Sequence, residues 1–374
     1  MQSASSRRGR IRQAHLWLVA LGSVLVATEL VRERASIDRY VEDFVPAFWQ
    51  PWLALRADSN PYPDPGAPLL DGSPFLYPPL SVEVTLPLSW LTFDQAFAVF
   101  AAVLVVASAL TLWALEISHP ALWVIWMSNV IVVETVALGN ASLLVILGVA
   151  LAWRWRDRPG PAAAALTAAL VVKLFVLPVL LWFLFTRRYR AAVYTIAAST
   201  TLVIGSWVVI GFDGLVDYPE LLATTSEELG PNGLLAYALA VKSVSHEVAA
   251  AIGLAAAGAL LAGAFARRRD DRASMTLALL ASLYATPVMW VHYLGLLIVP
   301  AALYGGWVWA TIPLTTLWLL APTGVPRPGW LITCFIVMTA AVTARAFVQG
   351  ASRTSRPTTN GPRLVEYPPP TSSA

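Results

Sequence analysis

The chain has little charge, little lysine and almost no cysteine. Of its 374 residues, only 13% are charged and 57% are hydrophobic, and the mean hydropathy is +0.65. This balance excludes the ordinary soluble globular proteins and predicts an integral membrane protein. The single cysteine, Cys334, excludes an intramolecular disulfide and a cysteine-ligated zinc or iron site.

Motifs for nucleotide or metal chemistry are also missing. The chain contains no Walker loop, no GxGxxG segment and no HExxH segment, so we expect no cofactor and no metal site. The formal net charge of +3 comes from short arginine clusters, which in membrane proteins set the orientation of the chain. We therefore expect membrane lipids, and no nucleic acid, among the partners.

Long apolar runs are what the sequence does have. Runs of roughly 15 to 22 apolar residues recur, and each should be a helix because the bilayer core cannot hydrate a peptide backbone. The predicted fold is all-α and polytopic, with roughly ten to twelve transmembrane helices. The first run, residues 16–31, follows a basic start and has no small-residue cleavage site, which indicates an uncleaved signal anchor.

The arginine clusters predict the orientation. By the positive-inside rule, both termini lie on the cytoplasmic side of the plasma membrane together with three clusters, at residues 153–158, 187–190 and 267–272. The acidic first loop, residues 32–76, then lies outside the cell. We expect residues 1–350 to form one transmembrane domain and the Ser-, Thr- and Pro-rich residues 351–374 to form a disordered cytoplasmic tail.

One apolar run has to remain on one side, because an odd number of crossings would separate the two termini. Residues 77–93 are the first candidate, since their three prolines suit a broken or re-entrant segment. The alternative is residues 121–153, which Gly139 and Asn140 divide into two short spans.

The chain has only two lysines, Lys173 and Lys242, among 25 basic residues. Residues 161–186 lie between two arginine clusters and are too few for two full helices of about 20 residues each. Lys173 is therefore predicted at a shallow turn, where its ammonium group could meet a phosphate in an outward-facing cavity. The alternative is a lysine that extends to the membrane interface, which is also how we interpret Lys242.

The first loop presents Asp43 next to an amphipathic stretch, residues 44–55. A short helix lying along the membrane surface would hold this carboxylate at the lipid–water boundary. A solvated loop acid is the alternative, because the loop carries seven acidic residues. Arg39, four residues earlier, could orient Asp43 or bind phosphate, or could form a surface ion pair with Glu42 or Asp38.

A series of short motifs follows this acid in order. The series covers most of residues 43–300 and consists of Asp43-Phe44, Asn60-Pro61-Tyr62, Phe75-x-Tyr77-Pro78-Pro79, and the segments 138–144, 172–178 and 286–293. The last three are similar to Gly-Gln-x-Asn, Lys-x-x-Pro and Ser-Pro-x-Ser-Trp-x-His-His elements. Together they resemble glycosyltransferase family 87, the polyprenol-phosphate-mannose-dependent α-mannosyltransferases of the actinobacterial type, which have the GT-C fold.

The chain departs from the family pattern at several positions. Asn140 replaces the usual Gln, a small residue replaces the later Asn, and Tyr293 replaces the second His. The spacing from the lysine to the proline is also longer. These positions bear on recognition of the donor headgroup and hence on which sugar is used.

The resemblance implies a catalytic role for Asp43 and donor-binding roles for Lys173, His292, Tyr77 and Asn140. A lipid-linked sugar already carries a phosphate leaving group, so an inverting transfer needs one base and a cradle for the anion. For His292, a hydrogen-bonded histidine at a helix start is the structural alternative.

The expected enzyme moves a hexose, mannose by resemblance, from a polyprenyl-phosphate donor to a hydroxyl of a lipid or glycan acceptor outside the cell. It would act in the synthesis of cell-envelope glycolipids. The alternative from another class is a secondary transporter or lipid flippase, which also needs broken helices and charges within the membrane. The absence of a second copy of residues 43–79 disfavours that alternative.

Overall fold

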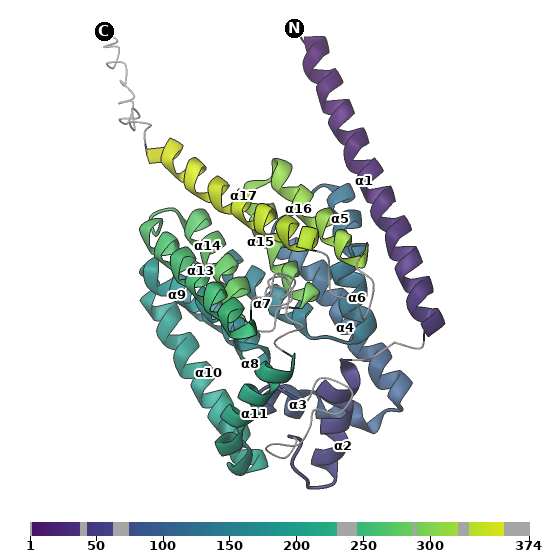
Figure 1. The fold of residues 1–374 in the computed structure, drawn as a ribbon, viewed down its shortest axis with the longest axis vertical. Coiled ribbons are helices and arrows are strands. Elements are labelled where there is room, and N and C mark those ends of the chain that lie inside the picture. The colour runs from purple at the N-terminus through teal and green to yellow at the C-terminus, as the bar shows by residue number, and fades with distance from the viewer. Residues whose placement is uncertain are drawn as a thin grey trace, which may run out of the picture.

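The structure is a computed structural model that describes residues 2–37, 43–62, 75–229, 245–286, 290–320 and 329–354. Every regular element in these ranges is a helix, and none is a strand. The predicted all-α class is confirmed (Figure 1).

The helices fall into three groups along the chain. The first group comprises α1 (Gln2–Ile37), η1 (Val45–Trp49), α2 (Gln50–Arg56), α3 (Pro79–Thr85), η2 (Leu86–Trp90), α4 (Phe93–Ala114), α5 (Pro120–Met127), α6 (Val130–Leu138) and α7 (Ser142–Arg154). The second comprises α8 (Pro159–Val172), η3 (Leu174–Val176), α9 (Leu177–Phe185), α10 (Tyr189–Ile210) and α11 (Asp213–Leu229). The third comprises α13 (His246–Ala266), α14 (Asp271–Ala285), η5 (Val291–Leu297), α15 (Ile298–Tyr304), η6 (Gly306–Ala310), α16 (Thr311–Leu314), η7 (Thr315–Leu320) and α17 (Gly329–Thr354).

Few helices are long enough to cross a membrane alone. Within the described ranges there are four, namely Gln13–Arg32 of α1, α4, α10 and Glu247–Ala266 of α13, and the bent pair α5 and α6 makes a fifth if counted as one span. The other apolar helices have 10 to 17 residues. Glycine, lysine and proline interrupt the other apolar runs, so the expected count of ten to twelve transmembrane helices stays a prediction.

The short helices α8 and α9 form the hairpin predicted around Lys173. Lys173 itself is extended, with φ of −147° and ψ of 125°, and ends α8. At the far ends, Arg188 Nε donates to the backbone oxygen of Arg156 at 2.9 Å. The chain thus leaves the arginine-rich end of the molecule, turns at Lys173 and returns.

Residues 77–93 contain only α3 and η2, of seven and five residues. Both are much shorter than the ~20 residues of a spanning helix. They are tied to α2, because Trp52 Nε1 donates to Thr85 Oγ1 at 3.0 Å and Arg56 Nη1 to Ser89 O at 2.7 Å. In Figure 1 this group lies at the end of the molecule away from the N-terminus. Neither element is long enough to cross a bilayer by itself, and in the rival region α5 and α6 meet at a bend of 45°.

The amphipathic stretch after Asp43 packs inside the protein. Phe44, Phe48 and Trp52 are at most 2% exposed, and Phe44 contacts the rings of Phe97 and Phe100 on α4, each at 5.4 Å between centroids. Phe48 and Trp52, expected to face lipid, therefore face the protein instead. Packing against aromatic rings removes more of their apolar area from water than a half-immersed interface would.

Gly139 lets the first loop approach the end of α6. It has φ of +69°, and a Cβ built on it would lie 2.6 Å from Phe44 Cβ. The backbone N–H of Asp43 donates to the oxygen of Leu138 at 3.2 Å. Only glycine combines this left-handed conformation with so close a neighbour.

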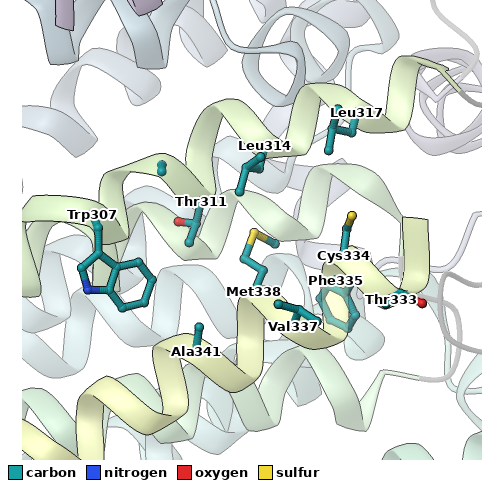
Figure 2. Close-up of a pocket in the computed structure, with 11 residues that line it drawn as sticks. Trp307, Thr311, Leu314, Leu317, Thr333, Cys334, Phe335, Val337, Met338 and Ala341 are labelled. Atoms are coloured by element: carbon teal, nitrogen blue, oxygen red, sulfur yellow. The ribbon is translucent and has the colours of Figure 1, made fainter. Parts of the chain in front are cut away.

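A separate apolar cavity of about 340 Å³ lies between α16 and α17. Figure 2 shows Thr311 and Leu314 on one wall and Met338 and Ala341 on the other. Cys334 is exposed and lines the same cavity.

We predict that Gly139→Ala destabilises the protein. The left-handed backbone costs about 1–2 kcal/mol with a Cβ present, and the contact with Phe44 adds to this cost. The thermal midpoint of the purified protein in detergent should fall by several degrees. Gly258→Ala is the control, because nothing lies within 4 Å of the added Cβ and alanine favours a helix. Equal midpoints for the two variants would contradict the packing described here.

Candidate active site

The predicted site residues meet where helices break. Asp43 precedes η1, Tyr77 precedes α3, Asn140 lies between α6 and α7, Lys173 ends α8, and His292 lies in η5. Breaks release backbone and side-chain groups from the regular helix pattern, and in a membrane protein such groups persist only where the protein satisfies them or where they line a cavity.

The side-chain amide of Asn140 stands between Asp43 and Lys173. Its Nδ2 donates to Asp43 Oδ2 at 2.8 Å, and its Oδ1 accepts from Lys173 Nζ at 2.9 Å. The carboxylate and the ammonium group are therefore joined through one amide and do not form a direct ion pair.

Ser142 determines how this amide is oriented. Its backbone N–H donates to Asn140 Oδ1 at 2.9 Å and its hydroxyl at 2.7 Å, and the same hydroxyl accepts from Lys173 Nζ at 3.0 Å. Three donors converge on Oδ1, so the amide NH₂ group has to face Asp43. Ser142, the first residue of α7, was not among the predicted site residues.

Two aromatic rings complete the surroundings of Lys173. Its Nζ lies 4.8 Å from the ring centroid of Tyr293 and 5.2 Å from that of Tyr77, distances that allow cation–π attraction. Phe175 stacks on Tyr293 with centroids 4.4 Å apart and planes 14° apart. These contacts turn Lys173 into the protein and rule out a side chain extended to the membrane interface.

His292 is 4% exposed, and its ring lies against that of Tyr293 at 4.8 Å. Its Nε2 is buried and has no hydrogen-bond partner within the described residues. A buried ring nitrogen without a partner costs about 1–3 kcal/mol. Residues 287–289, just before this helix, lie outside the described residues, so the binding role and the hydrogen-bonded histidine at a helix start both stay predictions.

The Asp43 carboxyl lies in the first loop, outside the membrane-capable helices. Burial raises its pKa above the ordinary value of 3.8, while the hydrogen bond from Asn140 and the charge of Lys173 act in the opposite direction. One carboxylate oxygen accepts from Asn140, and the other has no such bond in this part of the structure. The hydrogen bond from Asn140 therefore fixes the orientation of the carboxyl group.

The Asn60-Pro61-Tyr62 motif supports this site without belonging to it. Asn60 Oδ1 accepts from the backbone N–H of Tyr62 at 3.0 Å, and the Tyr62 hydroxyl donates to the backbone oxygen of Tyr77 at 2.7 Å. Tyr218 of α11 donates to the oxygen of Leu76 at 2.7 Å. These bonds hold the segment that presents Tyr77.

Some of the predicted residues lie in parts of the chain that the structure does not describe. Arg39 and Lys242 lie outside the described residues, as do residues 287–289 of the motif that contains His292. Within the described ranges, no group of three or more His, Cys, Asp or Glu side chains could hold a metal ion. Tyr293 was noted in the sequence only as a departure from the family pattern, and its contact with Lys173 depends on the fold.

Comparison with known proteins identifies the family. The model of glycosyltransferase family 87 matches residues 75–300, which is more than half of the chain and includes Tyr77, Asn140, Lys173 and His292. No curated protein and no solved structure matches the chain. Family membership sets aside the transporter and flippase alternative. The chain belongs to glycosyltransferase family 87 and is a membrane glycosyltransferase.

Proposed function

We propose that the protein transfers a hexose, mannose by family resemblance, from a polyprenyl-phosphate donor to a hydroxyl group of a lipid or glycan acceptor, with inversion at the anomeric carbon. The observation that supports this proposal is the arrangement of Asp43, Asn140 and Lys173, in which a carboxylate and an ammonium group bind the same amide.

In this mechanism the acceptor oxygen attacks the anomeric carbon while Asp43 takes the proton from the hydroxyl group. The bond between the anomeric carbon and the phosphate oxygen breaks, and the phosphate leaves with the bonding electrons from the opposite face. A single displacement needs no covalent intermediate and therefore only one carboxylate. The hydrogen bond from Asn140 to Oδ2 leaves Oδ1 to accept the proton.

Lys173 and His292 are proposed to stabilise the leaving phosphate. Negative charge develops on the phosphate oxygen as the bond breaks, and oriented donors in a partly dehydrated site stabilise that charge strongly. The Lys173 ammonium group is held by Asn140 and Ser142, so little reorganisation is needed. The buried Nε2 of His292, when it carries the ring proton, supplies a second donor. Arg39 would add a third donor, and Tyr77 packs against the lysine.

The proposed setting is a GT-C fold with both termini in the cytoplasm and the site facing the extracytoplasmic side of the plasma membrane. The first loop reaches the site through Asp43, and the arginine clusters gather at the other ends of α7, α9 and α13. We propose that the shorter apolar helices supply the remaining passes, so that the chain crosses roughly ten to twelve times.

Asp43→Asn should abolish sugar transfer, because the variant keeps the shape and loses the base. General-base catalysis contributes about 10²–10⁴-fold, so a loss of at least about 100-fold is expected. Transfer of radiolabel from polyprenyl-phosphate mannose in membranes measures it. Asp58→Asn is the matched control from the same loop, because Asp58 is exposed and its φ of +52° is tolerated by asparagine. Wild-type activity in Asp43→Asn would overturn the assignment.

The rate of transfer should fall at acid pH. The base works only when ionised, so the rate rises with pH through the pKa of Asp43, which burial raises above 3.8. A pH–rate profile of the wild type should therefore show an acid limb above that value, and the residual activity of Asp43→Asn should lack it. The same limb in both proteins would assign the ionisation to another group.

Lys173→Met and His292→Ala should each impair use of the donor more than use of the acceptor. Loss of one donor to a developing anion typically costs about 10²–10³-fold in rate. Steady-state kinetics with the two substrates varied in turn measure the separate effects on kcat/KM. Equal effects on donor and acceptor would instead indicate a role in folding, which the thermal midpoint of each variant reports independently.

A further inference from the structure

A second cavity, of about 710 Å³, opens at the arginine-rich end of the molecule. It lies between the turn after α4, the end of α7, the turn between α13 and α14, and the end of α15. None of the candidate active-site residues lines it. The 13 residues of α7 run from Ser142 beside Asn140 to Arg154, about 20 Å away at 1.5 Å per residue.

Four arginines line this cavity: Arg156, Arg267, Arg269 and Arg272. Each guanidinium group carries five N–H donors, and few of them are used. Arg272 Nη1 donates to the oxygen of Leu303 at 3.3 Å, and Arg267 Nη2 donates to the oxygen of Phe347. Arg156 Nη1 donates to the oxygen of Trp153 at 3.1 Å, while its buried Nε has no hydrogen-bond partner in the described part of the chain.

The three acids that also line the cavity are engaged by other groups. Asp271 accepts from Arg188, which lies outside the cavity, at 2.8 and 2.6 Å. Asp270 accepts from two backbone N–H groups at the start of α14, and Glu116 pairs with Arg154 at 3.3 Å. Arg156 Nε forms only long ion pairs, with Asp271 at 3.7 Å and with Asp157 at 3.9 Å. The cavity therefore presents guanidinium donors in excess over acceptors, which suits an anion.

The remaining walls are apolar. Leu115, Trp153, Ala266, Ala302 and Leu303 line the cavity, and the Arg156 guanidinium group lies 4.3 Å from the Trp153 ring centroid. A free phosphate ion needs neither this space nor these walls. A phosphate group attached to glycerol and the first carbons of acyl chains uses both.

We propose that this cavity binds the phosphodiester headgroup of an anionic phospholipid from the leaflet at the arginine-rich end. Basic pockets between transmembrane helices are suited to such headgroups, and arginine pairs with phosphate oxygens through two parallel N–H donors. The site is distinct from the proposed transferase chemistry and does not depend on it.

The test measures lipid binding to the purified full-length protein in neutral detergent, by titration with fluorescent phosphatidylglycerol and phosphatidylcholine. The wild type should prefer phosphatidylglycerol. Each arginine near a membrane surface contributes about five-fold in affinity for anionic lipid, so Arg269→Gln with Arg272→Gln should weaken phosphatidylglycerol binding by about 25-fold. Phosphatidylcholine binding should not change.

Arg190→Gln is the matched control, an exposed arginine at the same end that does not line the cavity. It should leave phosphatidylglycerol affinity unchanged. Arg269→Gln alone keeps the test valid if the double variant fails to fold, because Arg269 is exposed and no polar partner of its side chain lies in the described structure. The single variant should lose about five-fold.

Three results would overturn the proposal. The first is unchanged phosphatidylglycerol affinity in the variants, and the second is an equal loss in Arg190→Gln, which would indicate general surface charge. The third is displacement of phosphatidylglycerol by millimolar inorganic phosphate, which would assign the cavity to a free phosphate. Because the readout is binding, failure here leaves the transferase proposal intact, and loss of transfer in Asp43→Asn leaves this one intact.

Discussion

One amide group, the side chain of Asn140, organises the candidate active site. It donates to the carboxylate of Asp43 and accepts from the ammonium group of Lys173, so it joins the first loop to the centre of the helical bundle. A direct ion pair would neutralise both groups and occupy the carboxylate oxygens. The bridging amide keeps the two charged groups apart, while Ser142 prevents the amide from turning over.

Helix breaks are the feature that brings these groups together. An unsatisfied backbone group in hydrocarbon is costly, so a helix within a bilayer ends only where other groups satisfy it. At the break after α6, the N–H of Asn140 donates to the oxygen of Thr135 at 2.9 Å, and the Asn140 side chain accepts from the backbone of Ser142. Asn140, which lies at the break, therefore also positions the Asp43 carboxylate and the Lys173 ammonium group. Lys173 also has two roles, because it ends α8 and supplies the ammonium group.

The sequence reasoning succeeded where local constraints act. The hairpin at Lys173 follows from the number of residues between two arginine clusters, and the short elements in residues 77–93 follow from proline. It failed for the direction that Phe48 and Trp52 face, because amphipathic spacing alone cannot tell a membrane surface from a protein surface as the apolar partner. Ser142 and Tyr293 were missed because their value lies in contacts with Lys173, and such contacts join residues 31 and 120 positions apart.

By itself, the sequence determined that this protein lies in a membrane, that it is helical and which family it belongs to. Apolar composition demands a bilayer, a bilayer demands satisfied backbone groups, and the ordered motifs specify a glycosyltransferase. Only the tertiary structure decided that Asp43 and Lys173 share one amide, that Phe44 is buried against α4 and Gly139, and that four arginines line a cavity at the far end. The physical reason is that hydrogen bonds and close packing depend on the distances between atoms, and residues far apart in the chain acquire those distances only when the helices pack.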